Sequence, residues 1–156
     1  MAEPKSPPKI VVAKNRKALH EYEILDKVEA GIVLVGTEVK ALRDGKCNLS
    51  GAFARIHEDE IFLEGVEIQE YSYGNLRNHS PKRTRKLLLH RHQIRKLDQQ
   101  IRVKGNTLVP LEIYFSGSRA KLELAVGRGK AEYDKRQSKA EKEAKREIAR
   151  ATRRRD

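Results

Sequence analysis

The 156-residue sequence contains no tryptophan and a single cysteine, Cys47. One thiol cannot form an internal disulfide or a cysteine-based zinc site, which excludes two common ways of stabilising a small protein. A chain of this kind fits the reducing cytoplasm. We expect Cys47 to be an ordinary packed or half-exposed thiol, with a reactive role as the alternative.

Long apolar runs are also absent, and the longest, 32–35, holds four residues. A membrane-spanning helix needs about 20 apolar residues, and no segment has the profile of an interfacial anchor. The opening segment, MAEPKSPPK, lacks the apolar centre of a secretory signal. We therefore expect a cytoplasmic protein with no membrane partner.

Aromatic side chains are few, with five tyrosines and three phenylalanines. A long stacking platform for single-stranded nucleic acid is therefore not expected. Positive charge is abundant instead: 34 Lys and Arg stand against 22 Asp and Glu, which gives a net charge of +12. Such a balance favours a polyanionic partner. With membranes disfavoured, the surface of a folded RNA fits best.

No local motif supports catalysis or metal binding. His90 and His92 are two residues apart, and helical neighbours must be three or four apart to share a face. The segment 127–130 lacks the spacing of a phosphate-binding loop. We expect no enzyme activity, no cofactor and no metal. A metal-free ribonuclease that uses histidine and lysine is the alternative from a different class.

The alternation of apolar and polar residues predicts about six short strands, at 9–13, 20–25, 32–35, 53–57, 61–68, 108–115 and 119–126, with the first a short extended piece. Glu29–Gly31 is expected to form a bend, and 37–44 a short helix before Gly45. Acidic residues 58–60 and the Ser116–Ser118 segment are expected to form hairpin turns. Many short strands joined by glycine-rich turns favour a small closed barrel or a sandwich. The predicted fold is mainly β with α, a small antiparallel barrel of the oligonucleotide-binding type.

A basic stretch, 81–101, is expected to organise this fold. Leu87, Ile94 and Ile101 recur every seven residues, which predicts one helix along the stretch, with Leu97 and His90 on the same apolar stripe. The neighbouring face carries Arg91, Arg95 and Arg102. We predict that this helix packs on the β-rich body and offers cations to an RNA, the alternative being a solvated basic face. The candidate RNA-binding cations here and in the cluster near residue 15 are Lys14, Arg16, Lys17, Arg83, Arg85, Lys86, Arg91 and Arg95.

Two terminal segments lack the apolar residues of a core. Residues 1–8 hold three prolines among polar residues and are expected to be disordered. Residues 130–156 hold eleven basic and six acidic residues, a net charge of +5. This tail has good helix propensity, so we expect it to be disordered when free and helical along RNA. A solvated tail without function is the alternative. The organised domain is then 9–129.

An ordered series of short motifs resembles the SsrA-binding protein (small protein B) family. The series runs in the family's order over about residues 9–150: Asn15-Arg16-Lys17-Ala18, His20-Glu21-Tyr22, Glu29-Ala30-Gly31, Gly36-Thr37-Glu38-Val39-Lys40, Thr84-Arg85-Lys86-Leu87-Leu88-Leu89, Gly127 to Lys130, and Asp134-Lys135-Arg136. On these motifs the chain is identified as a member of the family.

The resemblance implies a function without catalysis. Family members bind the tRNA-like domain of transfer-messenger RNA, one protein per RNA, and carry it to bacterial ribosomes stalled without a stop codon. This process, trans-translation, tags the incomplete protein. The implied fold is an oligonucleotide-binding barrel with about three helices, whose tail enters the empty messenger channel. The alternative is a general barrel-fold translation factor or RNA chaperone on the small ribosomal subunit.

The resemblance also implies roles for particular residues. Glu29, Leu88 and His90 match positions that contact the tRNA-like domain. His90 stands where some relatives have asparagine, and core packing is the alternative for Leu88. The positions that match the family's decoding-centre motif are Lys130, Tyr133, Asp134, Lys135 and Arg136, with Tyr133 in place of a histidine found in some relatives.

Overall fold

The computed structural model describes residues 8–73, 78–130 and 142–150. Its strands are β1 (Lys9–Lys14), β2 (Tyr22–Ile32), β3 (Cys47–Asn48), β4 (Phe53–His57), β5 (Glu60–Glu64), β6 (Glu67–Ile68), β7 (Arg85–Leu88), β8 (Asn106–Ser116) and β9 (Arg119–Gly129). Its helices are α1 (Arg16–Glu21), α2 (Gly36–Arg43), α3 (Arg91–Ile101) and a helix at 142–150 in the tail. The prediction of a mainly β fold with helices is confirmed.

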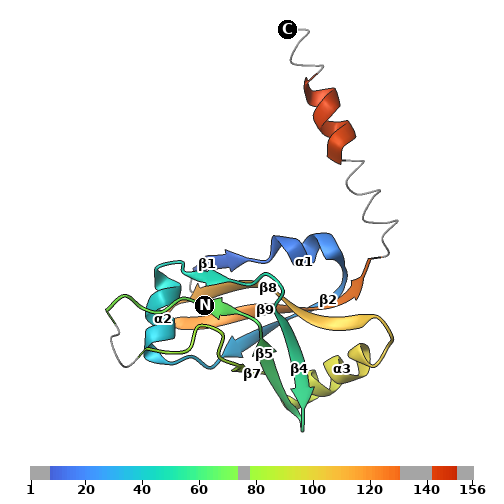
Figure 1. The fold of residues 1–156 in the computed structure, drawn as a ribbon. Coiled ribbons are helices and arrows are strands. Elements are labelled where there is room, and N and C mark those ends of the chain that lie inside the picture. The colour runs from blue at the N-terminus through green and yellow to red at the C-terminus, as the bar shows by residue number, and fades with distance from the viewer. Residues whose placement is uncertain (1–7, 74–77, 131–141, 151–156) are drawn as a thin grey trace, which may run out of the picture.

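The main sheet closes on itself through antiparallel pairings. Its strand order is β1-β8-β4-β5-β7-β2-β9, and β9 also pairs with β8, so six strands form a ring while β1 pairs with β8 beside it. The ring encloses the main apolar core. Figure 1 shows α2 at one end of the sheet, α3 at the other and α1 beside β8. Each helix therefore covers a different part of the ring.

Two hairpins follow the sequence pattern closely. β8 and β9 pair along nearly their whole length, with Leu122, Leu124 and Val126 buried in the core as their alternation predicted. β4 and β5 are joined by Glu58 and Asp59, which both have positive φ, at 49° and 61°. This is the conformation of a two-residue hairpin turn whose twist matches that of the strands. Both predicted hairpins are confirmed.

β2 is one continuous strand, which corrects two predictions. Glu29, Ala30 and Gly31 pair in register with residues of β9 and form no bend. The irregularity in this strand lies earlier, between Ile24 and Asp26. The predicted strand start at His20 is also wrong, because the Asn15 side chain accepts a hydrogen bond from the Ala18 N–H at 3.1 Å and begins helix α1 there.

The predicted helix over 81–101 is only half correct. Arg85–Leu88 is strand β7, which pairs with β5 and β2, and the helix α3 begins at Arg91. Ile94 and Leu97 are buried and fix the inner face of α3. Leu87 lies in the same core but reaches it from a strand. Its seven-residue distance from Ile94 is therefore not a helical repeat.

Gly65 and Cys47 have environments that are set by the fold. The chain bends at Gly65, which has φ +82°, and a Cβ added there would lie 3.2 Å from the Ala52 Cα. Cys47 is half-buried, and burial raises the pKa of its thiol to about 11, as fits a packed cysteine. Among the described residues no helix is long and apolar enough to cross a membrane. The predicted disorder of 1–8 falls almost wholly outside the described residues.

Candidate nucleic-acid interface

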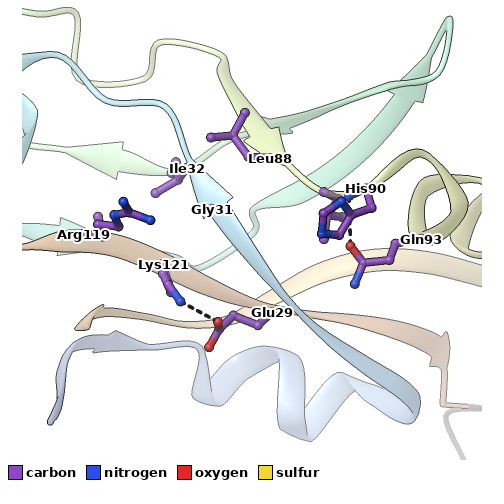
Figure 2. A pocket seen from close by; sticks show the side chains of 10 residues that line it. Glu29, Gly31, Ile32, Leu88, His90, Gln93, Arg119 and Lys121 are labelled. Carbon is purple, nitrogen blue, oxygen red and sulfur yellow. Dashed lines mark hydrogen bonds and ion pairs between the residues drawn. The ribbon is translucent and has the colours of Figure 1, made fainter. Parts of the chain in front are cut away.

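A groove on the outside of the ring brings together residues from three distant segments. Glu29 and Gly31 come from β2, Leu88 and His90 from the end of β7, and Arg119 and Lys121 from β9. Figure 2 shows these side chains around one hollow. The β2–β9 and β2–β7 pairings create it, since Gly31 lies opposite both Lys121 and Leu88.

Glu29 is the acidic group of the groove. Its Oε1 accepts a hydrogen bond from Lys121 Nζ at 2.9 Å, and its Oε2 accepts one from the Tyr114 hydroxyl. The hydrogen bond from Lys121, followed by that from Tyr114, lowers the pKa of Glu29. The side chain is still 54% exposed. Glu29 is therefore a fixed carboxylate at neutral pH that can accept further hydrogen bonds from a ligand.

Leu88 supplies the apolar part of the groove. Its side chain projects outward from β7 and is 54% exposed, while Leu87 points into the core. The glycine opposite leaves room for Leu88, because a Cβ on Gly31 would lie 3.2 Å from the Leu88 Cβ, a tight contact. The alternative of core packing for Leu88 is therefore wrong. An exposed leucine beside a carboxylate suits the flat face of a base or sugar.

His90 lies at the junction of β7 and α3. It is the residue that precedes the first turn of α3, and its backbone N–H donates a hydrogen bond to Gln93 Oε1 at 2.9 Å. The ring is exposed and stacks on His92, with centroids 5.6 Å apart and an interplanar angle of 8°. The interpretation of His90 as a packed histidine on a helical stripe is wrong. The ring is available at the mouth of the groove.

Arg85 is the main correction among the predicted cations. Its side chain and that of Glu38 are both fully buried, and Arg85 Nε donates to Glu38 Oε2. Its Nη1 donates to the Val66 carbonyl at 2.9 Å and its Nη2 to the Pro81 carbonyl at 3.1 Å. Every nitrogen of the guanidinium is thus committed inside the protein. Arg85 cannot reach an RNA phosphate and instead ties β7 to α2.

Arg83 is only partly available. Its side chain is 36% exposed, and one Nη donates to Glu38 Oε1 at 2.5 Å. Together Arg83 and Arg85 hold both oxygens of the Glu38 carboxylate. Arg83 is not among the residues that line the groove.

The remaining predicted cations fall into two groups. Lys86 and Arg91 lie with Leu88 around a second hollow, and Arg95 follows one turn later on α3. All three are exposed, and Lys86 Nζ lies 3.3 Å from Glu60. The second group, Lys14, Arg16 and Lys17, is exposed at the start of α1, which packs on β2 and β8. Lys86 and Arg91 therefore adjoin the groove at Leu88, which lines both hollows. The second group lies along a different part of the sheet.

Comparisons with known proteins identify a family for this chain. A family model described as "SmpB protein" matches residues 12–154. The chain belongs to the SmpB family. An SsrA-binding protein from Thermobifida fusca (strain YX) is 56% identical over 144 residues, which are 92% of this chain and 90% of that one. One from Corynebacterium jeikeium (strain K411) is 57% identical and covers 90% and 77%.

A solved structure described as "tmRNA-SmpB: a journey to the center of the bacterial ribosome" contains a chain with a similar fold. The two chains share 50% sequence identity with a TM-score of 0.67, over 77% of this chain and 85% of the other. The similarity thus extends from sequence to three-dimensional structure. It covers most of the body of this SmpB family member.

Three polar residues of the groove in this SmpB family member were not predicted from the sequence: Gln93, Arg119 and Lys121. The outward direction of Arg119 and Lys121 was evident from the alternation in β9. Their proximity to Glu29 depends on the register between β2 and β9, which the alternation does not fix. Gln93 lies in the first turn of α3, whose start was misplaced.

The residues that match the family's tail motif lie mostly outside the described residues. The Lys130 N–H donates to the Glu21 carbonyl at 3.0 Å, so the last described residue after β9 is attached to the end of α1. The other candidates, Tyr133, Asp134, Lys135 and Arg136, are outside the described residues. In the described ranges no three His, Cys, Asp or Glu side chains gather as a metal site would require.

Proposed function

We propose that this protein binds the tRNA-like domain of transfer-messenger RNA and delivers that RNA to stalled bacterial ribosomes for trans-translation. The observation that carries the proposal is the groove, in which Glu29, Leu88 and His90 meet although they come from two separate segments. The sequence resemblance assigns RNA contacts to the same three positions. The names of the relatives, SsrA-binding proteins, support the same partner.

The groove offers three kinds of contact to a folded RNA. The Glu29 carboxylate can accept hydrogen bonds from base or 2′-hydroxyl donors. Leu88 can pack against an exposed base or sugar, and His90 can stack or donate beside it. Lys121, Arg119, Lys86 and Arg91 lie around these groups and can neutralise phosphates. Glu29, Leu88 and His90 would thus select the RNA, and the cations would hold its backbone.

We also propose a division of labour along the chain. The closed ring of strands in 9–129 is, in this proposal, an RNA-binding barrel of the oligonucleotide-binding type, supported by the pairing of β9 back onto β8. The tail, 130–156, enters the empty messenger channel and reports the missing message at the decoding centre through its Lys130–Arg136 motif. Its helix propensity and the helix at 142–150 support an ordered bound form.

The remaining parts of the proposal follow from these partners. The protein acts as a binding factor and catalyses no reaction, one copy serves each RNA, and the site of action is the cytoplasm, where ribosomes work. Residues 1–8 are proposed to lie outside the RNA-binding domain.

The decisive test is whether removing the Glu29 side chain strengthens or weakens RNA binding. Removing an acidic side chain next to RNA strengthens binding if only overall charge matters. If Glu29 makes a specific contact, Glu29→Ala weakens binding to the isolated tRNA-like domain by about 10-fold or more, since a hydrogen bond to a charged group contributes about 1.5–3 kcal/mol. Filter binding at fixed salt measures this affinity.

Two exposed residues of β2 supply matched controls. Glu23, which pairs with Arg128, controls for the charge of Glu29, and Leu25, 45% exposed, controls for Leu88. Glu23→Ala and Leu25→Ala are expected to change the affinity by less than about twofold, whereas Leu88→Ala weakens it. Equal affinities for the Glu29→Ala and Glu23→Ala proteins would contradict the assignment of the groove.

A further inference from the structure

Two tyrosines stand beside the exposed face of α2, away from the residues that line the groove. Tyr73 is 81% exposed, the largest exposed fraction among the exposed large hydrophobic side chains of the described residues. Its ring meets that of Tyr71 edge to face, with centroids 5.6 Å apart and an angle of 66°. Lys40 Nζ lies 5.5 Å from the Tyr71 centroid. The Tyr71 ring, against which the exposed Tyr73 packs, therefore has a cation near it.

The segment that carries these tyrosines is attached to the body. The Asn78 side chain donates to the Tyr71 carbonyl at 2.8 Å and accepts from the Tyr71 N–H at 2.9 Å. His79 is buried, and its two ring nitrogens lie 2.9 Å from the Thr37 hydroxyl and 2.8 Å from the Ile68 carbonyl. Tyr71 is thus held at a fixed place next to α2, with Tyr73 two residues further.

α2 adds a second cation on the same side. Lys40 and Arg43 are three residues apart on α2 and both are exposed, a spacing that puts them on one helix face. Arg43 lies over the Phe115 ring, with its guanidinium carbon 4.7 Å from the centroid. No hydrogen bond or ion pair within the described parts of the chain uses the N–H donors of either side chain. These donors are available to a ligand.

We propose that Tyr73, Lys40 and Arg43 form a second RNA contact that shares no residue with the groove. An unstacked base packs on the Tyr73 ring, and Lys40 and Arg43 neutralise the phosphates next to it. Exposed aromatic rings with cations alongside hold unstacked bases in this way, which favours RNA over a protein partner. The inference rests on the proposed function, because that function supplies the RNA.

Photo-crosslinking from position 73 tests the contact directly. Tyr73 is replaced by the photoreactive amino acid p-benzoylphenylalanine in the full chain, which is mixed with full-length transfer-messenger RNA, alone and with stalled ribosomes. The matched control carries the same group at Phe53, an aromatic residue that is 44% exposed on β4. We expect an RNA crosslink from position 73, mapped to an unpaired nucleotide, well above the control. Crosslinks only to protein, or none above the control, would overturn the proposal.

Affinity measurements on the same complexes provide a second test. Tyr73→Ala is expected to weaken the complex in which the crosslink forms by about 10-fold, while Tyr73→Phe keeps the stacking ring and stays within about twofold. Equal affinity of the Tyr73→Ala and wild-type proteins in both complexes would also overturn the proposal. A Glu29→Ala protein run in parallel separates the two hypotheses. Wild-type RNA affinity in that protein, together with a persistent RNA crosslink from position 73, contradicts the groove and supports the second contact.

Discussion

Arg85 and Lys86 are adjacent on β7 and carry the same charge, but the structure gives them opposite roles. Arg85 is fully buried against Glu38, whereas the Lys86 side chain is 45% exposed. Alanine at position 85 is therefore expected to reduce stability, and alanine at position 86 to reduce RNA binding. This pair of variants separates a structural cation from a functional one without changing the location in the fold.

The magnitude at Arg85 follows from what its removal leaves behind. Burial alone would raise the pKa of Glu38, but hydrogen bonds from Arg83 and the Val35 N–H, with the charge of Arg85, outweigh it and keep this pKa below its ordinary value. Without Arg85 a buried carboxylate loses its fully buried partner. Breaking such a pair costs about 3–5 kcal/mol, a large part of the roughly 5–15 kcal/mol of a typical domain. We expect the unfolding temperature to fall by about 10 °C or more.

Replacing Lys86 is expected to reduce stability much less. Its ion pair with Glu60 spans 3.3 Å between two side chains that are each about half exposed, and such surface pairs contribute between about 0 and 1 kcal/mol. If Lys86 contacts one phosphate, its removal reduces the slope of log affinity against log salt concentration by about 1.

Urea unfolding followed by circular dichroism measures the loss of stability. Filter binding at several salt concentrations measures the salt dependence of RNA affinity. A double variant, Glu38→Met with Arg85→Met, is expected to regain much of the stability that Arg85→Met loses alone, because no unpaired charge remains. The reasoning would be refuted if Arg85→Ala unfolded at the wild-type urea concentration. It would equally be refuted if that protein, while folded, showed the flattened salt dependence expected for Lys86→Ala.

Three other predictions address the tail, the buried carboxylate and the groove. Deleting everything after Gly129 should leave affinity for the tRNA-like domain within about twofold and abolish tagging on stalled ribosomes; a large loss of RNA affinity would contradict the division of labour. The lowered pKa of Glu38 contributes stability above its ordinary pKa of about 4.5, lost as pH falls through the folded value. Urea midpoints between pH 7 and 3 should therefore fall less steeply for Glu38→Gln than for wild type. Tyr114→Phe removes one donor to Glu29 and raises its pKa, so RNA binding measured between pH 6 and 4 should weaken at a higher pH than in wild type; coincident profiles would contradict this role.

The sequence predicted the hairpins because their signals are local. In β8 and β9 the apolar residues alternate on both sides of a Ser-Gly-Ser turn, and in β4 and β5 the turn residues lie between two alternating segments. Both patterns depend only on neighbouring residues. The mainly β character of the fold followed from them.

The start of α3 could not be predicted in the same way. Leu87, Ile94 and Ile101 repeat every seven residues, but Leu87 belongs to a strand that pairs with β5 and β2. Those partners lie more than 20 residues away, so their hydrogen bonds are invisible to a local pattern. Tertiary pairing overrode the periodicity, and Arg85, which was predicted among the RNA-binding cations of the stretch, lies in the core.

The part of the groove that was predicted did not come from local sequence patterns. Glu29, Leu88 and His90 came from the resemblance to a family, and physical reasoning from the residues alone did not single them out. Lys121 carries no such mark in the sequence, and it joins Glu29 only because β2 and β9 pair in one register. The cations of local charge clusters were predicted as RNA-binding residues, but only the fold shows which of them are exposed.

The most direct measurement of the central claim is the RNA bound to the full chain in its own cell extract. The tagged protein is recovered by affinity capture and its RNA is sequenced, with the Glu29→Ala protein in parallel. The account predicts that one tRNA-like species, transfer-messenger RNA, dominates the wild-type sample and is strongly reduced in the variant. A broad mixture of ribosomal and messenger RNA would contradict it and favour a general translation factor, and the absence of RNA would contradict any RNA-binding role.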